Sequence, residues 1–355
     1  MALELDDDLF GNVAAAINPA GANIARVKDI LAGRPVVPAF VRITEPGVFR
    51  VPESEYHADP VEPYSISRGN ICMSIEKTMA HAKSEHPRFA PEPDEDEEAE
   101  EPKRKFDVGK AGHSLILEGE DVVEVVDPKD HPGPKGGIPK GWTTDAMKVI
   151  RAEIESRGKI AMLPKQAKRV QKMAEAFHRQ LAESDLGIKD LHAEGESETT
   201  VIWSEPNPFS KTPTFFRVRP DWKSFKKIYR GKRLVLDLKT TDQSASPGAF
   251  KPAEYAKDIQ EYMYRRGLKA VEGEDYAFLF AVIETKYPYL MSLISLDAMT
   301  KDMAKQKFEI GKEMWQKSLF TGDWPGYPTQ VCEVESKPWE IASWEAKSLT
   351  IGNEE

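Results

Sequence analysis

Three charged residues near the middle of the chain have the types and spacing that metal-assisted cleavage of a phosphodiester requires. Asp221 ends the run RVRPD, and Asp237 and Lys239 lie two residues apart within LVLDLKTT. Residues i and i+2 of a strand point to the same face of a sheet, so Asp237 and Lys239 are expected to project together, with Asp221 joining them from the neighbouring strand of a hairpin. Two carboxylates can hold Mg²⁺ beside a phosphate, while the lysine steadies the attacking water or the developing charge.

Four further side chains occur in an order that suits the same site. His113 lies on an expected early helix, and Glu198 begins the first of three expected strands. Gln260 and Tyr264 lie four residues apart on an expected helix after the lysine, so they share a helix face that could meet the carboxylates. Each of these residues alone is more often structural, and strand ends often carry charge. The prediction therefore depends on the whole set occurring in one order.

The charge of the chain is unevenly distributed. The formal net charge is −10, but residues 92–101 carry eight acids and no base, so the remainder sums to about −2. Between residues 217 and 239 there are nine Lys or Arg and only two acids, Asp221 and Asp237. Screening limits electrostatic reach to about 8–10 Å at physiological salt, so the local charge decides phosphate binding. We expect a basic surface around the two acids; a solvated, lysine-rich hairpin is the alternative.

Composition excludes several classes of protein. The 355 residues are 40% hydrophobic, which can build a sizeable core, and no apolar run approaches the roughly 18 residues of a membrane span. The start, MALELDDDLF, lacks the basic and apolar regions of a signal peptide. Two cysteines cannot form a disulfide framework or an iron–sulfur ligand set, and no G-x-x-x-x-G-K-[ST] motif indicates ATP hydrolysis. The expected location is the cytoplasm, with no membrane attachment.

The pattern of elements predicts an α/β (α+β) fold with a central mixed β-sheet flanked by helices. Strands are expected at 199–205, 214–221, 233–241, 276–284 and 289–296, and helices at 22–32, from Ser65 or Ser67, about 106–119, two within 143–183, about 253–270 and 297–319. Residues 46–330 are expected to form one domain that contains an acidic, disordered loop at about 90–104. Residues 1–45 form an amino-terminal extension of unassigned role, and residues 331–355 form a tail.

Several segments together resemble a known family. They are EYHADP near 55–60, FDVGKAGHSLILE near 106–118, ETTVIWSEP at 198–206, RVRPD at 217–221, LDLKTT at 236–241 and QEYMY at 260–264. The chain resembles the RecE-type exonucleases (exodeoxyribonuclease VIII) of phages and prophages, members of the PD-(D/E)XK nuclease superfamily related to lambda exonuclease. The resemblance implies a PD-(D/E)XK core. The acidic insertion at 92–101 and residues 1–45 have no counterpart in the family.

The resemblance also assigns roles to residues. His113, Asp221, Asp237 and the backbone carbonyl of Leu238 match the metal ligands, and Lys239 matches the catalytic lysine. Glu198 matches the acid of the preceding strand, and Gln260 and Tyr264 match a Q-x-x-x-Y motif. The implied cofactor is Mg²⁺, for which Mn²⁺ should substitute because an imidazole ligand suits Mn²⁺ better.

The implied activity is digestion of linear double-stranded DNA, 5′ to 3′, which leaves 3′ single strands for recombination by annealing. A RecT-type single-strand annealing protein is the implied partner, and a ring-shaped homo-oligomer the implied assembly. Contacts to DNA and its 5′ phosphate are expected from a helix start and a neighbouring strand, namely Ser65, Ser67, Arg68, Arg217 and Arg219, although helix capping explains the serines equally well. Two alternatives remain: a restriction or repair endonuclease on the same core, and a non-catalytic DNA-binding recombination protein.

Overall fold

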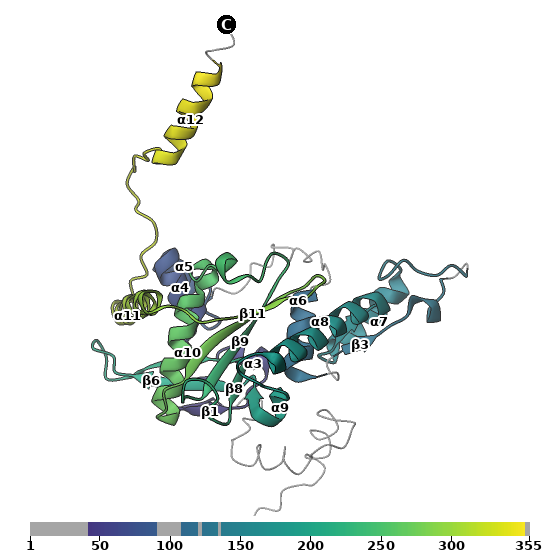
Figure 1. Cartoon of the computed structure of the whole chain (residues 1–355). Coiled ribbons are helices and arrows are strands. Elements are labelled where there is room, and N and C mark those ends of the chain that lie inside the picture. The colour runs from purple at the N-terminus through teal and green to yellow at the C-terminus, as the bar shows by residue number, and fades with distance from the viewer. Residues whose placement is uncertain (1–41, 91–107, 120–122, 134–135, 352–355) are drawn as a thin grey trace, which may run out of the picture.

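The computed structural model describes residues 42–90, 108–119, 123–133 and 136–351 (Figure 1). The expected helix at 22–32 and the acidic run 92–101 lie outside these residues. Two β-sheets form the centre of the described chain, and helices cover them. The predicted mixed α/β architecture is therefore confirmed. No helix among the described residues has the length and apolar character needed to cross a membrane.

The first sheet has four strands in the order β1-β6-β7-β2. The strands are β1 (Gly47–Phe49), β2 (Ser65–Ile66), β6 (Thr200–Glu205) and β7 (Thr214–Val218). β6 and β7 form an antiparallel hairpin in which Trp203 lies opposite Phe216, and their rings stack with centroids 5.1 Å apart. Residues of this hairpin contribute to the main core.

The second sheet has five strands in the order β11-β10-β9-β8-β5 and carries the predicted Asp/Asp/Lys set. Its strands are β5 (Gly195–Ser197), β8 (Trp222–Ser224), β9 (Leu234–Thr241), β10 (Ala277–Glu284) and β11 (Met291–Ile294). β9 and β10 are parallel, with Lys239 opposite Val282, and the other pairs are antiparallel. The sheet is therefore mixed, as the sequence predicts.

Both faces of the second sheet are covered, which explains why β9 and β10 read as nearly continuous apolar runs. On one face Val235, Phe278 and Phe280 pack with α10 (Lys257–Glu272) in the largest core cluster. On the other face Leu236 and Leu279 belong to a second cluster with residues of α6 (Val108–Glu118) and α8 (Pro164–Glu183). The central sheet thus has a helix layer on each side.

Further helices and short strands complete the body. The helices α4 (Arg68–Glu76) and α11 (Ala298–Thr321) pack on α10, and α5 (Met79–Ser84) follows α4. The remaining elements are α3 (Glu53–His57), β3 (Val123–Val125), η2 (Pro128–Asp130), α7 (Asp145–Ser156), β4 (Ile160–Met162), α9 (Leu191–Glu194), η3 (Pro247–Ala249) and η4 (Glu254–Ala256). The parallel pair β3 and β4 forms a separate two-stranded sheet.

The carboxy-terminal helix α12 (Pro338–Ile351) stands away from the body, at the end of an extended segment (Figure 1). Residues 325–349 are exposed throughout, including Val331 at 98% and Trp339 at 66%. After α11 the chain stays on the body as far as Tyr327, whose ring lies 5.5 Å from the His81 ring, and then leaves the surface (Figure 1).

The arrangement of strands differs from the expected one in two respects. The expected strand 214–221 is two elements: β7 ends at Val218 in the first sheet, and β8 begins at Trp222 in the second. Arg219, Pro220 and Asp221 form the crossing between the sheets. The short strands β1 to β5 and β8 were not predicted, because two or three residues are too few to show an alternating pattern.

Candidate active site

Asp221 lies at the crossing between the two sheets, directly before β8. In the antiparallel pair of β8 and β9, Trp222 is opposite Leu236, so Asp221 comes beside Asp237. The backbone N–H of Leu238 donates to Asp221 Oδ2 at 2.8 Å. Asp221 is 8% exposed and Asp237 is fully buried. The two carboxylates are therefore neighbours at the edge of the core, on the hairpin that the sequence predicts.

Asp237 and Lys239 project together from β9 and form an ion pair. The helix α10 faces them: the Gln260 side-chain Nε2 donates to Asp237 Oδ1 at 2.6 Å and also lies 3.1 Å from the Tyr264 hydroxyl. The spacing of four residues places Gln260 and Tyr264 on the buried face of α10. Both predicted juxtapositions, the pair on the strand and the pair on the helix, are present.

His113 and Glu198 complete a group of possible metal ligands. His113 Nε2 on α6 lies 3.0 Å from Asp221 Oδ2. One ligand atom from each of His113, Glu198 and Asp221 lies within 4.8 Å of the others. The sequence predicts that Glu198 begins a strand, but the residue lies between β5 and β6 with a φ of 56°. Its backbone N–H donates to the Asp221 carbonyl at 3.1 Å. This left-handed conformation turns the chain between the two sheets.

Burial and mutual repulsion raise the pKa of two of the acids. Burial, with the Asp221 charge second, raises the pKa of Glu198 to about 7 and that of Asp237 to about 6. Burial alone would raise the pKa of Asp221 as well, but the hydrogen bond from His113 and the charge of that residue outweigh burial. The pKa of Asp221 is therefore lowered. Acids held this close, beside an imidazole, suit a divalent cation, which would relieve their repulsion. The donor set therefore fits Mg²⁺ or Mn²⁺.

The side chains that lie close enough to share one ion are not the same set as the predicted ligands, and the ligand role of Asp237 stays a prediction. Glu198 joins His113 and Asp221, whereas Asp237 is held by Lys239 and Gln260. For Leu238 the described contact is its N–H to Asp221; a metal-ligand role for its carbonyl stays a prediction.

The candidate DNA-contacting residues separate into buried and accessible ones. Ser65 is fully buried and its Oγ donates to Asp59 Oδ1 at 2.7 Å. Arg217 is 3% exposed and donates to the Ser65 carbonyl, to the Ser65 Oγ and to the Tyr56 carbonyl. A fixed internal network uses both side chains, so neither is available to grip a phosphate in this conformation.

The start of α4 is better placed for that role. Ser67 caps the helix through a reciprocal pair of bonds with Asn70, the capping role noted from the sequence. Arg68, the first residue of α4, is half-buried. Its positive charge opposes the rise in the pKa of Asp237. Arg219 pairs with Glu198 and donates to the Val51 carbonyl at 2.7 Å. Arg219 therefore lies beside Glu198, and Arg68 is near enough for its charge to act on Asp237.

Tyr56 on α3 was not assigned a role from the sequence. The Arg217 and Arg219 guanidinium groups lie 5.6 Å and 6.0 Å from the centre of its ring. Its pKa is raised by burial, with an added contribution from Glu198. The signal in the sequence is the EYHADP segment, but it lies about 140 residues before Glu198 and no local pattern connects the two.

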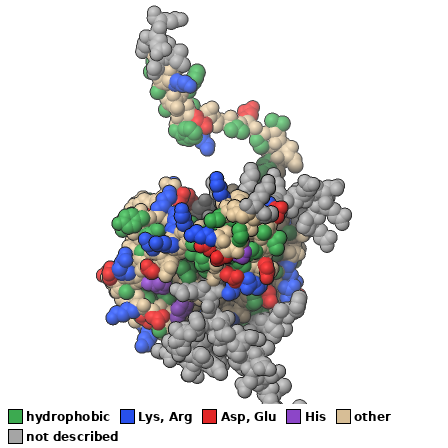
Figure 2. Space-filling model, turned by 90° about the vertical axis from the view of Figure 1, so that its right-hand side faces the viewer, with side chains coloured by type: hydrophobic (Ala, Val, Ile, Leu, Met, Phe, Trp, Pro, Cys, Tyr) green, Lys and Arg blue, Asp and Glu red, His purple; other side chains and the backbone are tan. Residues whose placement is uncertain are grey.

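The prediction of a basic surface around Asp221 and Asp237 is wrong for several of the bases, because they are buried or paired with acids. Lys223 is fully buried and pairs with Glu196 and Glu272, and Arg233 also pairs with Glu272. Arg217 pairs with Asp59 at 3.2 Å, and Arg219 and Lys239 pair with Glu198 and Asp237 as described above. Most bases of the 217–239 stretch are therefore neutralised internally. The exposed ones lie on the β8–β9 turn. On the face shown in Figure 2, basic and acidic side chains are interspersed.

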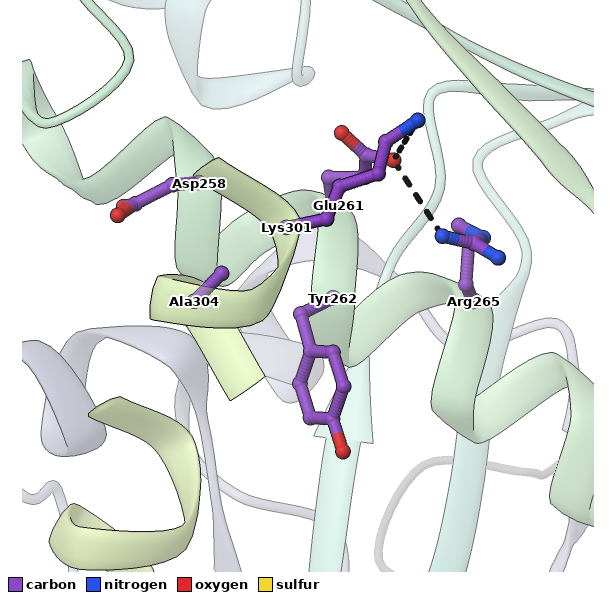
Figure 3. Close-up of a pocket in the computed structure, with 6 residues that line it drawn as sticks. All are labelled: Asp258, Glu261, Tyr262, Arg265, Lys301 and Ala304. Atoms are coloured by element: carbon purple, nitrogen blue, oxygen red, sulfur yellow. Dashed lines mark ion pairs between the residues drawn. The ribbon is translucent and has the colours of Figure 1, made fainter. Parts of the chain in front are cut away.

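A small, partly open pocket, with room for about one water molecule, lies between α10 and α11 (Figure 3). It is lined by Asp258, Glu261, Tyr262, Arg265, Lys301 and Ala304. Glu261 pairs with Lys301 at 3.4 Å and with Arg265 at 3.5 Å. These residues lie on another side of α10 from Gln260 and Tyr264, so the pocket is separate from the carboxylate cluster.

Comparison with known proteins identifies the family. The model described as a PDDEXK-like domain of unknown function (DUF3799) matches residues 74–338. A crystal structure from Eubacterium rectale, of a protein provisionally named an exonuclease, aligns at 12% identity over 81% of this chain and 96% of that one, with a TM-score of 0.44. The crystal structure of SSO0001 aligns at 12% identity over 48% of this chain and 68% of that one, with a TM-score of 0.22. No curated protein matches the sequence.

The family match covers about three quarters of the chain and includes every residue of the cluster from His113 to Tyr264. The two aligned structures share too little with this chain to add to it. The chain belongs to the DUF3799 family of PDDEXK-like domains and carries a nuclease domain of that type.

Proposed function

We propose that this protein is a metal-dependent exodeoxyribonuclease that degrades linear double-stranded DNA. The observation that carries the proposal is the meeting of His113, Glu198 and Asp221 beside the Asp237–Lys239 pair. An imidazole, three carboxylates and an ammonium in one buried corner are what metal-assisted phosphodiester hydrolysis needs. Preference for DNA ends is the finer part of the proposal, and it rests on the resemblance to RecE-type exonucleases.

Mg²⁺ is the proposed cofactor, with Mn²⁺ as a substitute. His113, Asp221 and Glu198 would hold it, with Asp237 close by. When bound, the metal polarises the phosphate and lowers the pKa of a water. The raised pKa values of Glu198 and Asp237 support this assignment, because a nearby cation would offset burial and the Asp221 charge by favouring the ionised form of both groups.

The remaining residues orient the reacting groups. Asp237 holds the Lys239 ammonium, whose side chain is 28% exposed and so reaches the open side of the site. There Lys239 can orient a water or offset charge on the phosphorus. Gln260 fixes the Asp237 carboxylate through the bond at 2.6 Å, and the Tyr264 hydroxyl lies beside the same amide. Arg68, at the start of α4, is the proposed contact for a DNA phosphate.

The polarity, partner and assembly follow from the same resemblance. The proposed direction is 5′ to 3′, which leaves 3′ single strands for recombination. A RecT-type annealing protein is the proposed partner, a ring-shaped homo-oligomer the proposed assembly, and the cytoplasm the proposed location. An endonuclease on the same core is the second candidate.

Degradation of end-labelled linear duplex tests the proposal. With Mg²⁺, the wild-type protein should release nucleotides from the 5′-labelled strand and spare a covalently closed circle of the same sequence. Asp237→Asn and Lys239→Ala should each reduce the rate by roughly a hundredfold or more, because each removes a group acting at the reacting phosphate.

The outcomes separate the parts of the proposal. Cutting of the closed circle would favour the endonuclease, and release from the 3′ end would reverse the polarity. Undiminished activity of both variants would show that Asp237 and Lys239 do not form the active site. Binding of DNA without any cleavage, in Mg²⁺ or Mn²⁺, would favour the non-catalytic alternative.

A further inference from the structure

The loop that joins β10 to β11 exposes a tyrosine at the active-site end of the second sheet. Tyr287 in this loop is 86% exposed. β9 and β10 are parallel, with Lys239 opposite Val282 and Thr241 opposite Glu284, so the loop after Glu284 continues beyond the end of β9 that carries Lys239. At about 3.3 Å per residue, the five residues from Val282 to Tyr287 span at most about 17 Å, the length of roughly five stacked bases. A DNA segment bound at the site is therefore within reach of Tyr287.

The backbone of this loop is fixed from several sides. The Thr285 N–H donates to the Thr241 carbonyl at 2.8 Å, and the Arg169 guanidinium on α8 donates twice to the Thr285 carbonyl, at 3.0 and 2.8 Å. On the far side, the Gln180 side chain on α8 donates to the Tyr289 carbonyl at 2.7 Å. The exposed tyrosine thus stands on a loop anchored to a neighbouring strand and a long helix.

The backbone of Tyr289, two residues after Tyr287, shows that the surrounding contacts enforce the conformation of the loop. Tyr289 has a φ of 57°, a conformation that bulky side chains rarely adopt and that persists only where surroundings enforce it. Its ring is 8% exposed and meets the Tyr287 ring edge-on, with centroids 6.3 Å apart. A buried tyrosine therefore supports the exposed one. Scattered exposed apolar residues are ordinary, but one supported in this way beside a nuclease site is a candidate contact.

We infer that Tyr287 stacks on a nucleobase at the end of the DNA that enters the active site. This inference rests on the proposed DNA nuclease function. An aromatic ring can cover the flat face of a base only where that face is free, at a duplex end or in a single strand, because neighbouring bases cover it inside a duplex. The exposed Lys286 beside the ring adds charge of the sign that suits the DNA backbone. Tyr287 is therefore a positioning residue for DNA ends.

The test measures DNA affinity without cleavage. In a Lys239→Ala background, fluorescence anisotropy gives the Kd for a blunt duplex and for a dumbbell of the same stem whose ends are closed by loops. Tyr287→Ala should weaken binding of the blunt duplex by roughly 5- to 100-fold, the range for losing one base–aromatic stack, and change dumbbell binding by less than about twofold. Tyr287→Phe should retain the wild-type affinity because it keeps the ring. Tyr327→Ala, which removes another exposed tyrosine, is the matched control.

A second measurement separates failure of this inference from failure of the proposed function. In the active protein, Mn²⁺-dependent hydrolysis of bis(p-nitrophenyl) phosphate reads the metal site alone and should be unchanged by Tyr287→Ala. Quenching of 2-aminopurine at the terminal position should be lost in Tyr287→Ala and kept in Tyr287→Phe. Equal affinity of all variants for the blunt duplex would overturn the stacking role while leaving the nuclease intact. A wild-type protein that neither binds nor cuts DNA would overturn both.

Discussion

At the scale of single residues, the feature that matters most is the crowding of acids. The backbone N–H of Glu198 donates a hydrogen bond to the Asp221 carbonyl, and both residues belong with His113 to the group of possible metal ligands. Asp237 lies beside Asp221 on β9. Asp221 keeps a lowered pKa because His113 compensates its charge, while Glu198 and Asp237 have raised values. Within one cluster, then, the environment divides the carboxyl groups by how readily they ionise.

This division predicts a pH-dependent metal affinity. A carboxyl group must lose its proton to bind a metal, and with pKa values of about 7 and about 6, Glu198 and Asp237 hold their protons at higher pH than usual. The Mn²⁺ affinity should therefore fall as pH decreases from 8 to 5.5, by roughly tenfold or more. Calorimetric titration across this range measures it. Glu198→Gln should weaken binding at pH 8 and flatten the dependence above pH 6; a pH-independent wild-type affinity would contradict the assignment.

At the scale of elements, one glutamate ties the first sheet to the helices that cover it. Glu205, at the end of β6, accepts from Arg266 of α10 at 2.8 Å, from Lys312 of α11 at 2.9 Å and from the Trp203 indole at 3.0 Å. Its side chain is only 11% exposed. Since α10 also carries Gln260 and Tyr264, this junction helps to set the helix position against the carboxylates.

Glu205 should make a pH-dependent contribution to stability. Its pKa is lowered to about 2: burial alone would raise it, but the bonds from Arg266, Lys312 and Trp203 prevail. The stabilisation is therefore fully present above the usual pKa of about 4.5 and is lost as pH falls from there to about 2. Glu205→Gln should lower the free energy of unfolding by roughly 2–3 kcal/mol at pH 7, and by progressively less below pH 4.

Urea denaturation at pH 7 and at pH 2.5 would measure this difference. Glu309, which pairs with the same arginine but is 38% exposed, provides the control: Glu309→Gln should cost less than about 1 kcal/mol. An equal loss for both variants at pH 7 would show that Glu205 holds no special position in the junction.

At the scale of the whole molecule, the described chain consists of one layered body and a carboxy-terminal segment that leaves it. Both core clusters lie against the two faces of the second sheet, and they contain no residue beyond Trp324. The helix α12 contributes none of the buried core residues, although it carries Trp339 and Trp344. The domain limits themselves, at residues 45 and 330, stay predictions.

Truncation after Gln330 should leave the body intact. The side chains that the structure describes beyond the cut, those of residues 331–349, are all exposed, so the melting temperature should change by less than about 2 °C, which for a domain of this size corresponds to less than about 1 kcal/mol. Mn²⁺-dependent hydrolysis of a small phosphodiester should also be unchanged. Differential scanning fluorimetry of the two proteins, side by side, measures the first expectation. A fall of 5 °C or more would show that the tail stabilises the domain.

The sequence by itself determined the parts of the site that depend on local periodicity. Asp237 and Lys239 share a face because a strand alternates every two residues, and Gln260 and Tyr264 share one because a helix returns every four. The sequence alone therefore predicts these two pairs, the order of the main elements and the mixed α/β class.

Only the tertiary structure decided which of the other charges reach the site. Arg217 and Lys223 belong to the same basic stretch as Lys239, but both are buried: Arg217 pairs with Asp59, and Lys223 pairs with Glu196 on the neighbouring strand β5. Glu198 reaches the metal group because the chain turns between two sheets there, which no local pattern reveals. Burial and pairing depend on contacts between segments far apart in sequence, and those contacts convert Asp221, Asp237 and Lys239 from charged strand ends into a candidate active site.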